Sequence, residues 1–331
     1  MRQDRVGYLD ILRSAAICFV VFLHAISSYV TDDALYGSAT WIVCIVLNEF
    51  CRMGVPLFFM ISGFLLLGSS KEETALGFYN KRLPKLIIPL IVWNVIYYLL
   101  PISPGGYSLS EFFARFFNNG TSYHMWYIYS MIGIYLIAPF LKKLLINCSA
   151  GEAVLLLGVL TWNTTLQPML NTVTPFYFNL TGSQSAGYLG YFLLGYIVGR
   201  YNFSKKWRYA VYALGAVGAF LGIYGNIAMS SREGLHLISN SGFTINHYLA
   251  VGALFCFAKY NFANAQNAVS NVFSRHSYNI FWVHALVLTF ANQYIALPKA
   301  WMQIMVTFVL AMAVSLFVSV VIERGKKLHI K

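Results

Sequence analysis

Long apolar segments joined by short polar connections constrain this chain more than any other feature. Each segment is close to the length, about 20 residues, with which an α-helix crosses the hydrocarbon core of a bilayer. Because backbone polar groups find no water there, they must bond within the helix itself. The sequence therefore predicts an all-α bundle of about ten transmembrane helices. The segments are 8–30, 41–68, 84–101, 124–146, 152–170, 184–200, 207–227, 243–262, 277–296 and 300–322.

The composition agrees with an integral membrane protein. Hydrophobic residues make up 58% of the chain and charged residues 10%, with a mean hydropathy of +0.62. Soluble proteins carry about a quarter of charged residues. The spans fill most of the 331 residues, so we expect one membrane domain over residues 1–331 and no separate soluble domain. The five cysteines are scattered without a C-x-x-C pair, which favours packing roles and predicts no metal site.

Lysine and arginine are distributed unevenly between the two sets of connections. Of the 23 basic residues, 18 fall on the side of the N-terminus and three on the other side, while two lie within spans. The net charge of +12 therefore reflects topology, and we expect no nucleic-acid partner. By the positive-inside rule both termini are predicted to be cytoplasmic, which requires an even number of crossings. Segments 152–170 and 184–200 are the least apolar, so an eight-span arrangement stays open.

Arg13 and His24 lie on the first apolar segment, where ionisable residues are expensive and usually functional. Eleven positions make almost three helical turns, so both side chains project from one face, about 16 Å apart along the axis. Asp10 stands one turn before Arg13 and can hold its guanidinium by an ion pair. A histidine here suits a general base or a nucleophile that carries an acyl group. The alternative for His24 is a structural histidine that forms a hydrogen bond inside the helix bundle. The alternative for Asp10 is an ordinary charged residue at the membrane interface.

The second segment, 41–68, is longer than a crossing needs and contains Gly54 and Pro56. We expect it to tilt, kink or break near its middle. Glu49 and Arg52 lie three residues apart on it, at membrane depth, where each offsets the desolvation of the other. That pair is either functional or purely structural.

A basic cluster opens the third segment. Arg82 and Lys85 follow Lys81 as K-R-x-x-K, and such side chains suit the phosphates of a cofactor. The same cluster is also what topology alone requires at a cytoplasmic helix end.

Two histidine motifs lie at other span ends. His124 and Trp126 begin the fourth segment from the outer side, where tryptophan is an ordinary anchor but histidine is not. His284 lies in the ninth segment, inward from its cytoplasmic end, and is expected to line the same cavity as His24. We assign no role to the four remaining histidines, His236, His247, His276 and His329. Nucleotide-hydrolase, dinucleotide, zinc-protease and serine-hydrolase motifs do not occur in the sequence.

Taken in order, these motifs resemble those of the membrane acyltransferase-3 family. The first-span pattern of arginine, ten residues and histidine is the hallmark of that family. Lys85 stands where the family usually has arginine, which keeps the charge and loses the bidentate fork. The matching elements are Arg13 with His24, R-M-G-V-P-L-F-F-M-I-S-G-F-L at 52–65, Arg82 with Lys85, H-M-W-Y at 124–127 and S-Y-N-I-F-W-V-H at 277–284.

The resemblance implies an acyl-CoA-dependent O-acyltransferase of the bacterial cytoplasmic membrane. The chain is similar to stand-alone O-acetyltransferases, such as that of enterobacterial common antigen. These imply acetyl-CoA as donor and a hydroxyl of a cell-surface or lipid-linked carbohydrate as acceptor, with lipids as neighbours. The implied roles are catalysis by His24, Arg13 and Asp10, donor binding by Arg13, Arg82, Lys85, Tyr278 and His284, and acceptor binding by His124, Trp126, Glu49 and Arg52.

A transporter is the alternative. The same membrane fold resembles the transmembrane half of vancomycin-resistance serine racemases, for which serine transport has been considered. In that case Arg13, Glu49 and Arg52 would bind a small zwitterion and His24 would relay protons. The sequence does not indicate the acceptor sugar, the acyl chain or the oligomeric state.

Overall fold

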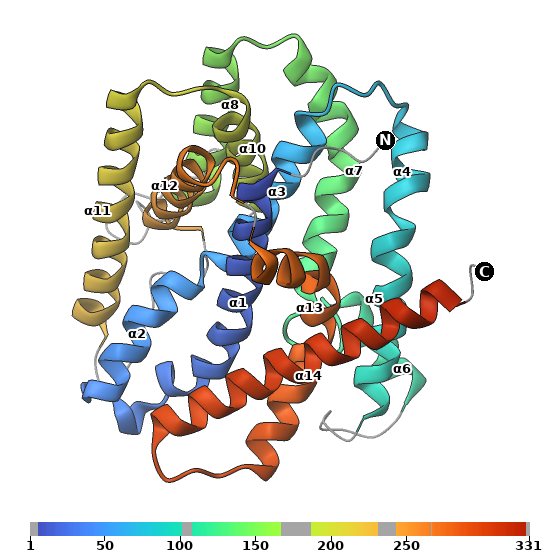
Figure 1. The fold of residues 1–331 in the computed structure, drawn as a ribbon, viewed down its shortest axis with the longest axis vertical. Coiled ribbons are helices and arrows are strands. Elements are labelled where there is room, and N and C mark those ends of the chain that lie inside the picture. Colours follow the sequence, from blue (N-terminus) through green and yellow to red (C-terminus); the bar gives the residue numbers. More distant parts are fainter. Residues whose placement is uncertain (1–5, 101–107, 167–186, 231–242, 266, 329–331) are drawn as a thin grey trace. The chain divides into compact units, whose positions relative to one another are not determined.

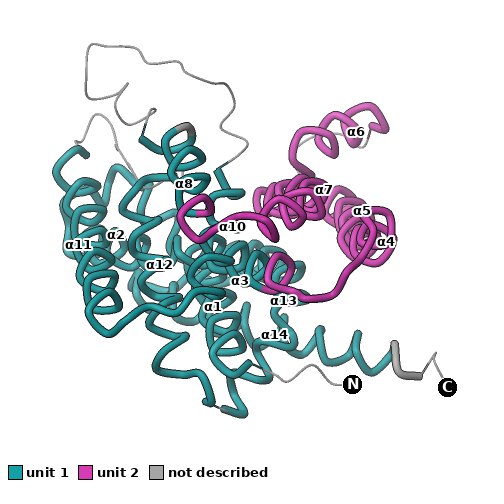
Figure 2. The backbone as a smooth tube through the Cα atoms, turned by 90° about the horizontal axis from the view of Figure 1, so that it is seen from above, with its two compact units in different colours: residues 1–64, 154–331 teal, residues 65–153 magenta. Residues whose placement is uncertain are grey.

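Every regular element that the structure describes is a helix (Figure 1). The computed structural model describes residues 6–100, 108–166, 187–230, 243–265 and 267–328. The chain divides into two compact units (Figure 2): unit 1 is Met1–Phe64 with Val154–Lys331, and unit 2 is Leu65–Ala153. The prediction of an all-helical fold is confirmed.

The helices are assigned to the unit that holds most of their residues. Unit 1 contains α1 (Gly7–Val30), η1 (Asp33–Leu35), α2 (Ala39–Cys51), α3 (Gly54–Leu67), α8 (Ala150–Thr161), η2 (Trp162–Leu166), α10 (Gly187–Arg200), α11 (Lys205–Met229), α12 (Ile245–Asn261), α13 (Ala268–Tyr294) and α14 (Ala300–Leu328). Unit 2 contains α4 (Ala75–Arg82), α5 (Pro84–Leu99), α6 (Leu109–Phe117) and α7 (Trp126–Ile146).

Six helical stretches among the described residues are long and apolar enough to cross a membrane, which makes the chain a multi-pass membrane protein. They are Gly7–Val30, Ala39–Leu67, Ala75–Leu99, Trp126–Ile146, Lys205–Met229 and Ala300–Gly325. The predicted number of ten spans stays a prediction. Helix α12 has 17 residues, fewer than the about 20 of an ordinary crossing. The predicted spans 152–170 and 184–200 lie partly outside the described residues.

The break predicted within segment 41–68 is present and separates α2 from α3 at Arg52 and Met53. Pro56 has no amide hydrogen, so the carbonyl of Arg52 receives no helical bond from it. The chain also passes very close to α1 here. A Cβ atom at Gly54 would lie 2.8 Å from the carbonyl oxygen of Ala16, so glycine is required at this position. Arg52, at the break, lies within Ala39–Leu67, one of the stretches long and apolar enough to cross a membrane.

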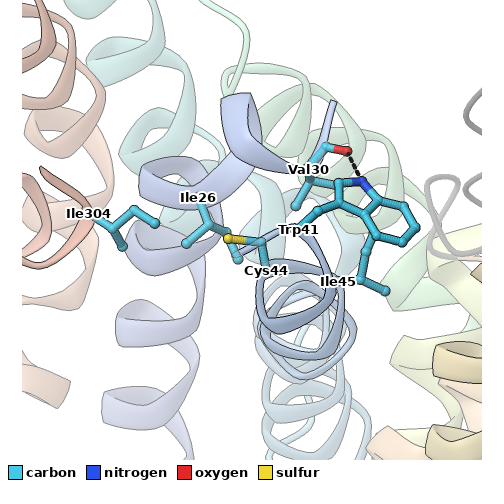
Figure 3. Packing of buried hydrophobic residues seen from close by; sticks show 6 residues of the cluster. All are labelled: Ile26, Val30, Trp41, Cys44, Ile45 and Ile304. Atoms are coloured by element: carbon cyan, nitrogen blue, oxygen red, sulfur yellow. Dashed lines mark hydrogen bonds between the residues drawn. The ribbon is translucent and has the colours of Figure 1, made fainter. Parts of the chain in front are cut away.

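Buried side chains lock α1 and α2 together (Figure 3). The indole N–H of Trp41, which is 1% exposed, donates to the carbonyl oxygen of Val30 at 3.2 Å. In lipid the hydrophobic effect contributes little to the association of helices, so close packing and hydrogen bonds between helices stabilise it. The cluster consists of Ile26, Val30, Trp41, Cys44, Ile45 and Ile304. It fixes the hairpin that carries His24 on α1 and Glu49 on α2.

Helix α1 is central to unit 1, because it packs against α2, α12, α13 and α14. Helices α11 and α12 pack against each other, as do α13 and α14. On the polar face of α1, Asp10 and Ser14 are buried by these helices, whereas Arg13 and His24 stay partly exposed.

Candidate active site

The polar face of α1 that runs from Asp10 to His24 is called the α1 stripe. Its N-terminal part is built around Asp10, a carboxylate that is 5% exposed. Its Oδ1 accepts a hydrogen bond of 2.5 Å from the hydroxyl of Ser274 on α13 and lies 3.9 Å from Nη1 of Arg13. Ser14, one turn along α1, donates to the carbonyl oxygen of Ser270 at 2.6 Å. Asp10 thus connects Arg13 to α13, and the Arg13 side chain keeps 32% of its surface exposed.

At the other end of the stripe His24 meets His284 of α13. The two rings stack with their centroids 5.4 Å apart and their planes 23° from parallel. His284 is fully buried, whereas His24 is partly exposed. The structure therefore brings together two histidines that the sequence places 260 residues apart.

The backbone fixes which nitrogen of His284 carries the proton. Nδ1 lies 2.7 Å from the carbonyl oxygen of Phe281 and 3.2 Å from that of Ile280. A carbonyl oxygen only accepts, so Nδ1 must be the donor and carry hydrogen in the neutral ring. Nε2 then carries the lone pair. His284 is held as a base whose reactive nitrogen points away from its own helix backbone.

Glu49 of α2 is the most enclosed carboxylate of the site, at 2% exposure. Its Oε1 accepts a hydrogen bond of 2.6 Å from the amide of Asn246, and its Oε2 accepts one of 3.3 Å from Asn226. His247 is also fully buried, and its Nε2 lies 3.7 Å from Oε1 of Glu49. The carboxylate is therefore surrounded by donors from α11 and α12.

Arg52 is the charged residue at the α2–α3 break. It interacts electrostatically with Glu49 and with Tyr188 of α10. It also interacts electrostatically with His24 and His247. Its side chain is partly buried at the α2–α3 break. One guanidinium is thus in range of both a fixed anion and the imidazole at the end of the α1 stripe.

The predicted basic cluster of unit 2 lies at the junction of α4 and α5. The Arg82 guanidinium donates to Glu73 at 2.6 Å, and Lys81 lies 3.8 Å from the same carboxylate. The hydrogen bond from Arg82 lowers the pKa of Glu73 below its usual range. Arg82 also covers the ring of Phe78 at 4.1 Å. Lys85 follows in the first turn of α5 and is exposed.

A polar cavity lies elsewhere in unit 2, where α6 ends and α7 begins. Its volume is about 520 Å³, and Trp126 and Arg115 line it together with the loop between the two helices. Asn119 and Gly120 shape that loop with φ angles of 70° and 101°. His124 is 2% exposed and does not line the cavity. Its Nδ1 forms a hydrogen bond of 3.1 Å with the hydroxyl of Ser122, and Ser122 does line the cavity. The remaining lining residues are Asn118, Asn119, Gly120, Thr121 and Tyr123.

The family model described as an acyltransferase domain, that of acyltransferase-3, matches residues 6–324. This chain belongs to the acyltransferase-3 family. The resemblance inferred from the motifs is therefore confirmed. The matched region includes every predicted site residue, from Asp10 to His284.

Two curated proteins show partial similarity to this acyltransferase. Nodulation protein 10 of Rhizobium leguminosarum bv. viciae is 33% identical over 102 residues, which cover 30% of this chain and 26% of that protein. An amino-acid racemase of Enterococcus faecalis is 28% identical over 200 residues, 56% of this chain and 27% of that protein. The matches span about a quarter of the length of each relative. No solved structure was found to match.

The predicted site residues of this acyltransferase divide between the two units. Each group is defined within its own unit. Unit 1 holds Asp10, Arg13, His24, Glu49, Arg52, Tyr278 and His284, and unit 2 holds Arg82, Lys85, His124 and Trp126. Tyr278 is 37% exposed, and its ring packs edge-on against Trp282 at 6.0 Å. Among the described residues, no group of three or more His, Cys, Asp or Glu is placed to hold a metal ion.

Sequence reasoning missed four polar residues that complete the site: Ser274, Asn226, Asn246 and His247. We assigned no role to His247 because it lies at a segment end, where polar residues are common. The available signal was the run of Asn246 and His247 at the start of an apolar segment. Only their burial, at 7% and 0%, distinguishes them from ordinary interfacial residues.

Proposed function

We propose that this acyltransferase moves an acyl group, acetyl in the simplest case, from cytoplasmic acyl-CoA to a hydroxyl of a cell-surface or lipid-linked carbohydrate. Its place would be the bacterial cytoplasmic membrane, with both termini in the cytoplasm. The observation that carries the proposal is the stacked pair of His24 and His284, of which His284 is held by backbone carbonyl groups through Nδ1. Deprotonation of a hydroxyl requires a base, and the imidazole of His24 is such a group at one end of the polar face of α1.

In the proposed reaction His24 takes the proton of the acceptor hydroxyl. The hydroxyl oxygen then bonds to the thioester carbonyl carbon, the carbon–sulfur bond breaks, and the thiolate leaves and takes up the proton. A second possibility is that His24 first accepts the acyl group itself and passes it on. Both routes need one ring nitrogen with a lone pair. Stacking on His284 restricts how the His24 ring can turn.

The phosphates of the donor would stay at the cytoplasmic side, because they cannot enter the bilayer core. Arg13, Arg82 and Lys85 would hold them, and Tyr278 and His284 would contact the pantetheine arm. The local geometry fits this only in part. The Arg82 guanidinium already bonds Glu73, so a phosphate has to compete with that carboxylate.

The acceptor would bind on the outer side of the membrane at His124 and Trp126. The cavity between α6 and α7 supports this with amide, hydroxyl and aromatic groups, the usual partners of sugar hydroxyls and ring faces. Its volume of about 520 Å³ is in the range of small-molecule sites.

The deciding experiment measures release of free thiol from acetyl-CoA by the purified protein in proteoliposomes, with surface glycans of the source bacterium as acceptor. Wild type should release thiol only when acceptor is present, and His24→Ala should lose this activity. His276→Ala is the matched control, since this histidine bonds Ser319 and is given no role in transfer. Equal rates for His24→Ala and wild type would refute the assignment. Uptake of labelled serine without acetyl-CoA would instead support the transporter.

A further inference from the structure

Glu49 has a buried carboxyl group that the proposed reaction does not use directly. Both of its oxygens accept hydrogen bonds from asparagine amides, Asn246 on α12 and Asn226 on α11. A carboxylate away from water is costly unless donors and a counter-charge compensate it. Here the donors come from two helices that follow α2 by more than 150 residues in the sequence. Helices α2, α11 and α12 therefore meet at this carboxylate.

Helix α11 is shaped to admit the carboxylate. A Cβ atom at Gly222 would overlap Oε1 of Glu49 and the Asn246 amide, so a side chain there would expel the group. Asn226 lies one turn further on the same face and is fully buried. Its own carbonyl oxygen accepts a hydrogen bond of 2.7 Å from Ser230. On the side of α11, the Glu49 carboxyl group is therefore closely packed against Gly222 and hydrogen-bonded by Asn226.

The counter-charge of Glu49 is Arg52, one helical turn away at the α2–α3 break. The same guanidinium interacts with His24. Gly54, two residues after Arg52, packs against α1 at Val20, one helical turn before His24, so the α2–α3 break and His24 lie on neighbouring turns.

We infer that Glu49 is a positioning residue that holds the Arg52 guanidinium beside His24, where it stabilises the negative charge developing on the acyl carbonyl oxygen. This inference rests on the proposed acyl transfer. As the hydroxyl oxygen bonds to the carbonyl carbon, the carbonyl electron pair moves to its oxygen, and it returns when the carbon–sulfur bond breaks. A cation fixed in advance in a water-poor site stabilises such a charge without reorganising. Glu49 itself contacts no substrate in this arrangement.

The test uses Glu49→Gln and a swap variant that restores the hydrogen bonds. In Glu49→Gln the oxygen can still accept from Asn246, but the new amide faces the Asn226 amide, donor against donor. Adding Asn226→Asp supplies an acceptor again and returns the negative charge to the cluster, though on α11 instead of α2. The swap therefore repairs the packing network without restoring the anion at position 49.

We expect Glu49→Gln to lower kcat by about tenfold or more and to leave KM for acetyl-CoA within about twofold, because the lost interaction acts on the transition state. Its melting temperature should also fall. The swap variant should regain the melting temperature and stay slow. If the swap regains both, Glu49 is a structural residue and the inference is wrong. The same holds if Glu49→Gln keeps the wild-type kcat.

Wild type and His24→Ala are measured in the same thiol-release assay. Thiol release by wild type that His24→Ala abolishes establishes the proposed function, so that equal rates for wild type and Glu49→Gln then overturn only the role of Glu49. If wild type releases no thiol with any acceptor, the proposed function fails, and the role of Glu49 in acyl transfer fails with it.

Discussion

The rings of His24 and His284 stack with their centroids 5.4 Å apart, so α1 and α13 meet through two imidazoles. The fixed Nδ1 bond of His284 makes it the more rigid partner. A fully buried ring held in one tautomer restricts the position of the ring stacked on it. Two groups that act as one unit give non-additive effects when both are removed.

We therefore predict that His284→Ala lowers kcat strongly and that the double variant His24→Ala/His284→Ala is no slower than His24→Ala alone. The reason is that His284 acts by placing His24. The measurement is a double-mutant cycle on acetyl-CoA-dependent thiol release. Losses that multiply would mean that the two histidines act independently.

Arg82 should contribute to donor binding. We expect Arg82→Ala to raise KM for acetyl-CoA by about tenfold or more, the equivalent of about 1.5 to 3 kcal/mol for a charged hydrogen bond to phosphate. Lys85→Ala should have a smaller effect, since a lysine lacks the bidentate fork. Titration of thiol release against acetyl-CoA measures both. If KM for acetyl-CoA is unchanged in both variants, the assignment of donor binding to Arg82 and Lys85 is wrong.

The ion pair of Arg82 with Glu73 should make local stability depend on pH. The pKa of Glu73 is lowered in the folded protein by the Arg82 hydrogen bond. Its stabilising contribution is therefore present above the ordinary carboxyl pKa, about 4.3, and is lost as pH falls through the lowered folded value. Melting temperatures of wild type and Glu73→Gln should differ slightly at pH 7 and converge in acid. A difference that grows in acid would contradict this account.

Gly54 should be required for the packing of α3 on α1. In Gly54→Ala the new Cβ would lie 2.8 Å from the Ala16 carbonyl oxygen and 2.9 Å from a methyl group of Val20. We expect a loss of about 1 to 3 kcal/mol in unfolding free energy, the usual result of overpacking. Gly133→Ala in α7 is the control, because no atom lies within 4 Å of its new Cβ. Thermal melts in detergent should show a fall only for the first variant.

Trp126 should affect the acceptor and not the donor. Because it lines the cavity of unit 2, we expect Trp126→Ala to raise KM for the glycan acceptor by about tenfold and to leave KM for acetyl-CoA within about twofold. Separate titrations of the two substrates measure this. A change in the acetyl-CoA constant alone would place the cavity on the donor path.

The sequence by itself determined the features that depend on local pattern and composition. Apolar length predicted helices and a multi-pass membrane protein, and the structure agrees. Gly54 and Pro56 predicted the break after α2, because backbone restrictions act within a few residues. The helical period placed Arg13 and His24 on one face of α1, and the order of five motifs indicated the family.

Only the tertiary structure decided which polar residues meet. Glu49 finds its donors 177 and 197 residues further along the chain, and Asp10 finds Ser274 at a distance of 264 residues. Apolar spans look alike in sequence, since lipid and neighbouring helices both accept apolar surface. The pattern therefore does not indicate which helix faces another. Close packing of specific side chains makes that choice, and it turned His247, to which the sequence gave no role, into a neighbour of Glu49.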